Sequence, residues 1–191
     1  MKKNFKPGKS WTLFLDRDGV INKRPVNDYV KSVKQFEFIE GVTESLNMLS
    51  KLFGKIIIVT NQQGIGKKLM TENDLSDIHS YMCNAIENAG GKIDKIYHCP
   101  DLENTGSKMR KPETGMGLKA KQDFPEVDFQ KSIMVGDTLS DMIFGKKLNM
   151  FNVLITNDIE SFCNQKQKVW DLHFSNVREF ADWALNQSNN K

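Results

Sequence analysis

Residues 55–64 read KIIIVTNQQG, and this stretch decides the fold. The apolar run 56–59 places β-branched side chains on both faces, as in a central parallel strand that helices cover on both sides. A polar turn containing a glycine follows this run at once. The stretch therefore predicts an open parallel sheet whose strands end in polar loops.

Short β-rich runs alternate with longer helical runs in the rest of the chain. Strands are predicted at residues 11–15, 55–60, 95–98, 132–135 and 151–155. Helices are predicted at or around residues 42–49, 75–86, 113–122, 141–148 and 177–186. Thr71 and Asp74 resemble a capping box for the second of these helices. The alternation predicts a doubly wound α/β fold, a parallel sheet in a three-layer α/β/α arrangement, with its ligand at the carboxyl ends of the strands.

The composition is that of a globular protein: of the 191 residues, 39% are hydrophobic and 27% charged, enough to bury a core without disulfides or metals. We find no repeat or linker and expect a single domain over residues 1–191, with residues 1–10 as a flexible basic arm.

No apolar run approaches the roughly 18 residues of a membrane span. The three cysteines are scattered, which favours a reducing compartment, so we expect a cytoplasmic protein. The net charge of +3 does not indicate a nucleic-acid partner.

Two carboxylates follow the first predicted strand. Asp16 and Asp18 are two apart, so on extended backbone they project to the same side before Gly19 lets the chain turn. Repulsion in one small volume would raise one pKa, giving one ionised group that attacks and one protonated group that donates. The alternative is that both residues are turn formers or helix caps.

Two more carboxylates follow the fourth predicted strand. Asp137 and Asp141 stand four apart, so a helix that begins near Thr138 places the second carboxylate one turn along from the first. The plain alternative makes Asp137 the N-cap of that helix. A third carboxylate beside Asp16 would instead complete a hard, oxygen-rich site of the kind that Mg²⁺ prefers.

Groups that bind phosphate are predicted at the same edge of the sheet. Arg110 and Lys111 precede Pro112, which suits the first position of a helix, and a cation beside a helix N-terminus favours a phosphate. After the second strand, Thr60 offers a hydroxyl and residues 61–62 offer backbone N–H groups.

Together these groups predict phosphoryl transfer. A phosphate dianion repels an attacking carboxylate, so the reaction requires a divalent cation between Asp16 and Asp137, with Lys111 on the far side. Asp16 would attack phosphorus in line to give an aspartyl-phosphate. Asp18 would protonate the departing alkoxide and then deprotonate the water that hydrolyses the intermediate.

In order and spacing, the four polar stretches resemble the four motifs of the haloacid dehalogenase superfamily of phosphatases. The stretches are DRDGVIN at 16–22, VTNQQG at 59–64, RKP at 110–112, and VGD at 135–137 with Asp141. Over residues 11–155 the chain looks most like the branch that holds the heptose-bisphosphate and histidinol-phosphate phosphatases. Residues 29–30 and 36–42 look more like the heptose enzymes.

The resemblance implies a role for each matching residue. Asp16 would be the nucleophile and Asp18 the general acid and base. Mg²⁺ would be held by Asp16, the main-chain carbonyl of Asp18 and Asp137, with Asp141 supporting the metal site from behind. Thr60 and Lys111 would stabilise the phosphoryl group. Substrate contacts are implied for Asn61, Gln62, Gln63 and Arg110, and are expected for Arg24 and Asn27 in a flap and for Thr138, where the heptose enzymes tend to have Lys.

The chain departs from this branch in one loop. Its relatives usually bind zinc through Cys-x-His before the third motif and Cys-x-Cys just ahead of Arg-Lys-Pro. The matching positions read Cys99-Pro100-Asp101 and Ser107-Lys108-Met109. One potential thiolate remains where a structural zinc needs four N or S ligands, so we expect no zinc.

The gaps between motifs narrow the choice of reaction. Neither residues 18–60 nor residues 98–110 can house a cap domain, so we expect an open site, which favours hydrolysis. The expected substrate is a small phosphorylated metabolite, a sugar phosphate such as D-glycero-D-manno-heptose 1,7-bisphosphate, with histidinol phosphate as the alternative. A polynucleotide 3′-phosphatase would want stacking aromatics and a basic groove, and a phosphorylatable switch would keep its phosphate. We expect a monomer or weak homo-oligomer with no membrane or nucleic-acid partner.

Overall fold

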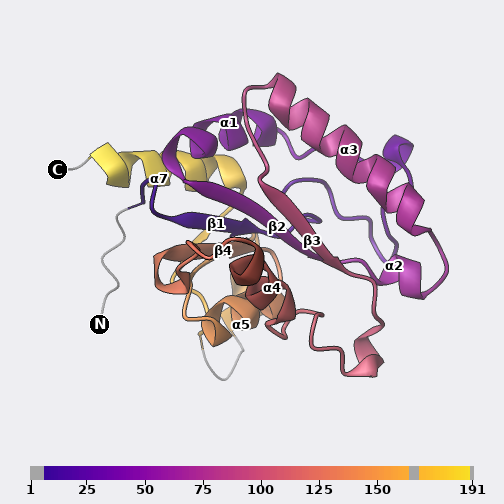
Figure 1. Cartoon of the computed structure of the whole chain (residues 1–191). Coiled ribbons are helices and arrows are strands. Elements are labelled where there is room, and N and C mark those ends of the chain that lie inside the picture. Colours follow the sequence, from indigo (N-terminus) through magenta and orange to yellow (C-terminus); the bar gives the residue numbers. More distant parts are fainter. Residues whose placement is uncertain (1–6, 164–167, 190–191) are drawn as a thin grey trace.

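The computed structural model describes residues 7–163 and 168–189, so most of the predicted basic arm, residues 1–6, lies outside the described residues. Within these ranges the chain forms a six-stranded sheet of order β3-β2-β1-β4-β5-β6, and every neighbouring pair is parallel (Figure 1). The strands are β1 (Thr12–Leu15), β2 (Lys55–Asn61), β3 (Lys95–Cys99), β4 (Ser132–Gly136), β5 (Phe151–Ile155) and β6 (Leu172–Phe174). The predicted doubly wound parallel sheet is confirmed.

The helices that connect the strands include all five that the sequence predicts. They are α1 (Val42–Leu52), α2 (Gln63–Gly66), α3 (Glu72–Asn88), α4 (Gly115–Asp123), α5 (Leu139–Lys147), α6 (Glu160–Cys163) and α7 (Val177–Asn189), with 3-10 turns η1 (Val33–Gln35), η2 (Glu103–Thr105) and η3 (Phe129–Lys131). The predicted capping box of Thr71 and Asp74 is confirmed at the start of α3. None of the described helices is long and apolar enough to cross a membrane.

The sheet is covered by helices on both faces. In Figure 1, α1, α3 and α7 lie on one side of the strands, and α4 and α5 lie on the other. The central strand β2 shows why, because Ile56 and Ile58 pack into one hydrophobic cluster while Ile57 and Val59 pack into the other. All four side chains are fully buried, each worth about 1.5–3 kcal/mol of burial free energy.

The order of the strands determines where a site can form. From β1 the chain builds β2 and β3 on one side of β1, then crosses to add β4 on its other side. A crevice opens at such a switch point, beyond the carboxyl ends of the two strands. Asp16 directly follows β1, and its backbone N–H donates to the Val135 carbonyl of β4 (2.9 Å). Between residues 18 and 60, all of which are described, the chain holds only loops, η1, α1 and most of β2, so no cap domain is inserted there.

The end of the predicted arm that the structure describes is attached to the fold. The Lys9 ammonium donates to the carbonyls of Ser50 (3.0 Å) and Phe53 (3.4 Å) at the C-terminal end of α1. Lys9 therefore complements the negative end of that helix.

Candidate active site

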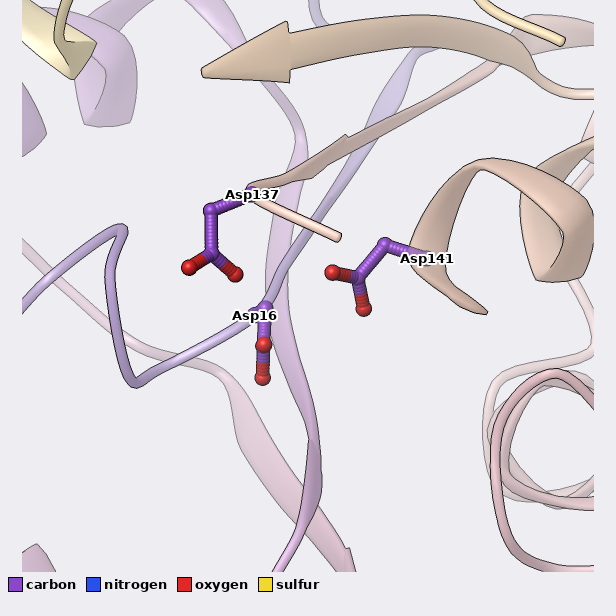
Figure 2. A group of neighbouring side chains, drawn as sticks. All are labelled: Asp16, Asp137 and Asp141. Atoms are coloured by element: carbon purple, nitrogen blue, oxygen red, sulfur yellow. The ribbon is translucent and has the colours of Figure 1, made fainter. Parts of the chain in front are cut away.

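Three carboxylates from separate elements meet beyond the ends of β1 and β4. Figure 2 shows Asp16, Asp137 and Asp141 beside one another, and one carboxylate oxygen of each lies within 4.8 Å of the other two. Asp16 follows β1, Asp137 follows β4, and Asp141 lies in the first turn of α5. The carboxylates therefore meet at the ends of the strands, as the sequence predicts.

The N-cap of α5 is Thr138, so the alternative that makes Asp137 the N-cap is wrong. The Asp141 N–H donates to the Thr138 hydroxyl oxygen (3.4 Å), and the Thr138 N–H donates to Asp141 Oδ2 (3.0 Å). Since Thr138 takes the capping role, the carboxylate of Asp137 is left to face Asp16. Gly19 makes room for it: with φ +86°, a Cβ there would lie 2.0 Å from Asp137 Oδ2.

A buried lysine lies between two of the carboxylates. Lys111 is 2% exposed, and its ammonium lies 3.0 Å from Asp16 Oδ1 and 2.5 Å from Asp141 Oδ1 while donating to the Val59 carbonyl (2.7 Å). Burial acts to lower the pKa of Lys111, but the two carboxylates outweigh burial and raise it. Lys111 is therefore a charged lysine that compensates Asp16 and Asp141.

Asp18 accepts hydrogen bonds from three side chains. The donors are Arg17 Nη2 (2.9 Å to Oδ1), Asn22 Nδ2 (2.9 Å) and Gln62 Nε2 (2.9 Å). Burial acts to raise the pKa of Asp18, but the charge of Arg17 and these hydrogen bonds outweigh burial and lower it. Arg17 is itself fully buried, and its Nη1 lies 3.3 Å from His79 Nε2.

The predicted division of pKa values between Asp16 and Asp18 needs a correction. Carboxylate repulsion was expected to keep one of the pair protonated, with Asp18 as the donor. The raised pKa belongs to Asp16 and comes first from burial, which Lys111 opposes, while repulsion by Asp18 is the weakest of the neighbouring charges. The sequence does not show that the buried side chain of Arg17, which lies between the two aspartates in the chain, forms an ion pair with Asp18.

Arg24 reaches the carboxylates from the loop after β1. Its Nε and Nη2 donate to the two oxygens of Asp137 (3.0 and 2.8 Å), and Nη2 also donates to the main-chain carbonyl of Asp18 (2.8 Å). Burial raises the pKa of Asp137 to about 7, with Arg24 opposing it and repulsion from Asp16 and Asp141 adding to it. Arg24 was expected to contact the substrate. Its guanidinium instead donates to Asp137 and to the Asp18 carbonyl, which are predicted metal ligands.

The turn after β2 is arranged differently from the prediction. The Gln62 N–H was expected to be free for a phosphate, but it donates to the Cys99 carbonyl (2.7 Å), because β2 and β3 stay paired to their ends. The Gln62 amide also donates to Thr60 Oγ1 (2.8 Å). Asn61 forms a reciprocal pair with Lys111, donating to its carbonyl (3.0 Å) and accepting from its N–H (2.9 Å). Gln62 and Asn61 therefore position Asp18 and Lys111.

The expectation that Pro112 begins a helix is wrong. The RKP motif itself forms a turn, which the Glu113 N–H closes by donating to the Arg110 carbonyl (2.8 Å), and α4 begins only at Gly115. Lys111 therefore reaches the carboxylates from a turn, not from a helix N-terminus.

A cavity of about 600 Å³ opens beside the carboxylates. Of the predicted site residues, those lining it are Asp16, Asp18, Arg24, Asn27, Asn61, Gln63, Arg110, Lys111 and Thr138. Thr60, Gln62, Asp137 and Asp141 are not among the residues that line this cavity. Tyr29 and Lys67 also line the cavity and were not predicted; Lys67 Nζ donates to the Tyr29 hydroxyl (2.9 Å), joining α2 to the flap. Nothing in the sequence marks that pair, since the two residues are far apart in the chain.

The loop before Arg110 is held by side-chain contacts at the positions that the family resemblance aligns with expected zinc ligands. The Cys99 thiol donates to Asp101 Oδ2 (3.5 Å) and lies 3.8 Å from the Ser107 hydroxyl. The Ser107 hydroxyl accepts from the Met109 N–H (3.2 Å). Arg110 Nη1 donates to the Asp101 carbonyl (3.3 Å). These contacts join the two ends of the loop, and the expectation of no zinc stays a prediction.

The chain is similar to a known family model, to named relatives and to a solved structure. Residues 12–152 match a family model described as polynucleotide kinase 3 phosphatase. The chain is 37% identical over 175 residues to D-glycero-alpha-D-manno-heptose-1,7-bisphosphate 7-phosphatase of Campylobacter jejuni, which covers 92% of this chain and 96% of the relative. A Mycobacterium bovis protein of the same name is 40% identical over 135 residues, 71% of each chain. D,D-heptose 1,7-bisphosphate phosphatase from B. bronchiseptica, solved with magnesium and phosphate, superposes with a TM-score of 0.85 at 25% identity, over 93% of this chain and 99% of the other.

Proposed function

The chain belongs to the haloacid dehalogenase superfamily and is one of its phosphatases, and from that premise we propose that it hydrolyses one phosphate ester of a heptose 1,7-bisphosphate. The observation that carries the proposal is the meeting of Asp16, Asp137 and Asp141 around Lys111 at the switch point of the sheet. The substrate is taken from relatives of 30–40% identity that are named heptose-1,7-bisphosphate 7-phosphatases.

The donor set fits Mg²⁺. Carboxylate oxygens are hard ligands, and the Arg24 guanidinium already lies among them as a bound cation. Asp16, the main-chain carbonyl of Asp18 and Asp137 would hold the ion, with Asp141 supporting them from behind. The bound ion supplies positive charge that offsets repulsion between a phosphate dianion and Asp16.

Asp16 and Asp18 would carry the two halves of the reaction. Asp16 attacks phosphorus, the ester P–O bond breaks, and Asp18 gives its proton to the departing sugar oxygen. Asp18 then takes a proton from the water that attacks the aspartyl-phosphate, so inorganic phosphate leaves and both carboxyl groups return to their starting states. An anionic phosphate beside Asp18 raises its pKa by repulsion, which favours the proton that it must donate.

The other predicted residues would bind and orient the substrate. Lys111 holds Asp16 in place and, with the Thr60 hydroxyl, stabilises the phosphoryl oxygens. Gln62 acts indirectly by holding Asp18 and Thr60. The residues left to contact the rest of the substrate are those lining the cavity: Arg24, Asn27, Asn61, Gln63, Arg110 and Thr138.

The cavity supports a small substrate with a second phosphate. It carries Arg24, Lys67 and Arg110 on its lining, which are cations suited to another anionic group. Tyr29 is the one aromatic residue among the described residues that line it, so it offers no row of rings on which successive bases would stack. This favours the sugar bisphosphate over a polynucleotide 3′-phosphate.

The test is release of inorganic phosphate with Mg²⁺ from both anomers of D-glycero-D-manno-heptose 1,7-bisphosphate, histidinol phosphate and a 3′-phosphorylated oligonucleotide. We expect kcat/KM for one heptose anomer to exceed that for the other two substrates by at least about 100-fold. Release from the oligonucleotide alone would contradict the proposal. A phosphoenzyme that persists for minutes would favour a phosphorylatable switch instead.

We also propose a cytoplasmic location and a monomer or weak homo-oligomer. Among the described residues, Cys83 and Cys99 are free thiols, which supports a reducing compartment. Sedimentation at micromolar concentration would test the oligomeric state.

A further inference from the structure

Arg24 lies where the three proposed metal ligands converge. Its Nη2 is 2.8 Å from the main-chain oxygen of Asp18, 2.8 Å from Asp137 Oδ1 and 3.6 Å from Asp16 Oδ2. One of these oxygens is an uncharged carbonyl, so the guanidinium does more than pair with the nearest carboxylate. It contacts the same three oxygens that we assign as ligands of Mg²⁺.

The ion and the guanidinium cannot share this position. Mg²⁺ bonds its oxygens at about 2.0–2.1 Å, so an ion coordinated by these three oxygens would overlap the Nη2 atom that lies among them. Two cations in contact also repel each other, and the low dielectric of a half-buried site strengthens this repulsion.

The Arg24 side chain has room to move from this position into the cavity. Its side chain is 46% exposed and its loop lines the cavity, so displacement breaks no packing in the core. The loop is held on both sides of Arg24, by the Lys23 N–H on the Glu37 carbonyl (2.8 Å) and by Tyr29 on Lys67 (2.9 Å). The backbone is therefore anchored while the side chain is able to swing over the cavity.

We propose that Arg24 and Mg²⁺ compete for one position, and that binding of the ion transfers the guanidinium to the cavity, where it binds the anionic substrate. This inference rests on the metal site of the proposed function. Before the ion binds, Arg24 compensates Asp137 and Asp16; afterwards its charge serves a phosphate or another anionic group. Metal binding and substrate binding are thereby coupled through one side chain.

The test is Mg²⁺ binding by calorimetry, without substrate, to the full chain and to Arg24→Met. If the guanidinium occupies the position in about nine of ten ion-free molecules, its removal tightens the measured Kd about tenfold. Arg178→Met is the matched control, because Arg178 is about as exposed as Arg24 and also pairs with an aspartate, Asp182, but lies in α7 and does not contact these oxygens. We expect it to change Kd by less than about twofold, since separated charges are screened by salt.

Thermal unfolding in EDTA and in saturating Mg²⁺ gives a second readout. Arg24→Met should lower the Tm in EDTA, where it leaves carboxylates uncompensated, and should match the wild type once Mg²⁺ is added. An equal loss of Tm under both conditions, or an unchanged Kd, would show that Arg24 stays on Asp137 and would overturn the exchange alone. Absence of Mg²⁺ binding to the wild type, with no difference from Asp137→Asn, would overturn both the exchange and the metal site.

Discussion

Replacement of Lys111 by Met should destabilise the protein strongly, because Lys111 is the buried counter-charge of two carboxylates. Its ammonium contacts Asp16, Asp141 and the Val59 carbonyl, and both carboxylates are at least nine-tenths buried. Methionine fills the same volume but leaves the carboxylates facing each other without the cation. Removal of one partner from a buried ion pair costs about 3–5 kcal/mol, so we expect a loss of that size.

Urea unfolding followed by circular dichroism at pH 7.5 in EDTA measures this loss. The double variant Lys111→Met with Asp141→Asn should lose less than the sum of the single variants, by about 1 kcal/mol or more, because the amide removes one of the stranded charges. Lys119→Met is the control: its ion pair with Asp123 is exposed, so the urea midpoint should hardly change. A loss below about 1 kcal/mol for Lys111→Met, or strict additivity in the double variant, would refute the reasoning.

Three further predictions concern single positions. Asp16→Asn should lower phosphate release by at least about 10³-fold while leaving the circular dichroism spectrum unchanged, and retained turnover would rule out Asp16 as nucleophile. Gly19→Ala should weaken Mg²⁺ binding at least about tenfold by calorimetry, because the new Cβ would lie 2.0 Å from Asp137 Oδ2; an unchanged Kd would show that Asp137 is not a ligand. The pKa of His79 is lowered to about 3 by burial, Arg17 and His98, so below pH 6.5 only the unfolded chain takes up this proton. Stability should fall by about 1.4 kcal/mol per pH unit, roughly 2 kcal/mol at pH 5, and His79→Gln should remove that slope between pH 6.5 and 5; equal slopes would contradict the burial argument.

The parts of the fold predicted from sequence are those with a local pattern. The run at 56–59 is apolar on both faces, and it lies in the buried strand β2. Asp16 and Asp137 meet because each directly follows a strand and because β1 and β4 are neighbours in the sheet. The strand β6 was not predicted, since its three residues are too short a run for alternation to be recognised and none of them is buried.

The electrostatics of the site could not be predicted, because they depend on burial and on contacts distant in sequence. Arg17 is an example: arginine is expected at the surface, yet this one is fully buried and lowers the pKa of Asp18. The raised pKa of Asp16 likewise comes first from burial, which a local sequence pattern does not show. Nothing near Arg24 in the sequence shows that its side chain ends on Asp137.

The order of the charged residues along the chain bears on how the protein folds during synthesis. The β1–β4 pairing is long-range, so the loop between these strands must close before the acidic cluster exists, and such contacts form slowly. The carboxylates brought together by that pairing repel one another. Arg24 and Lys111 both precede Asp137 in the chain. A ribosome therefore delivers both counter-cations before it delivers the last carboxylates that need them.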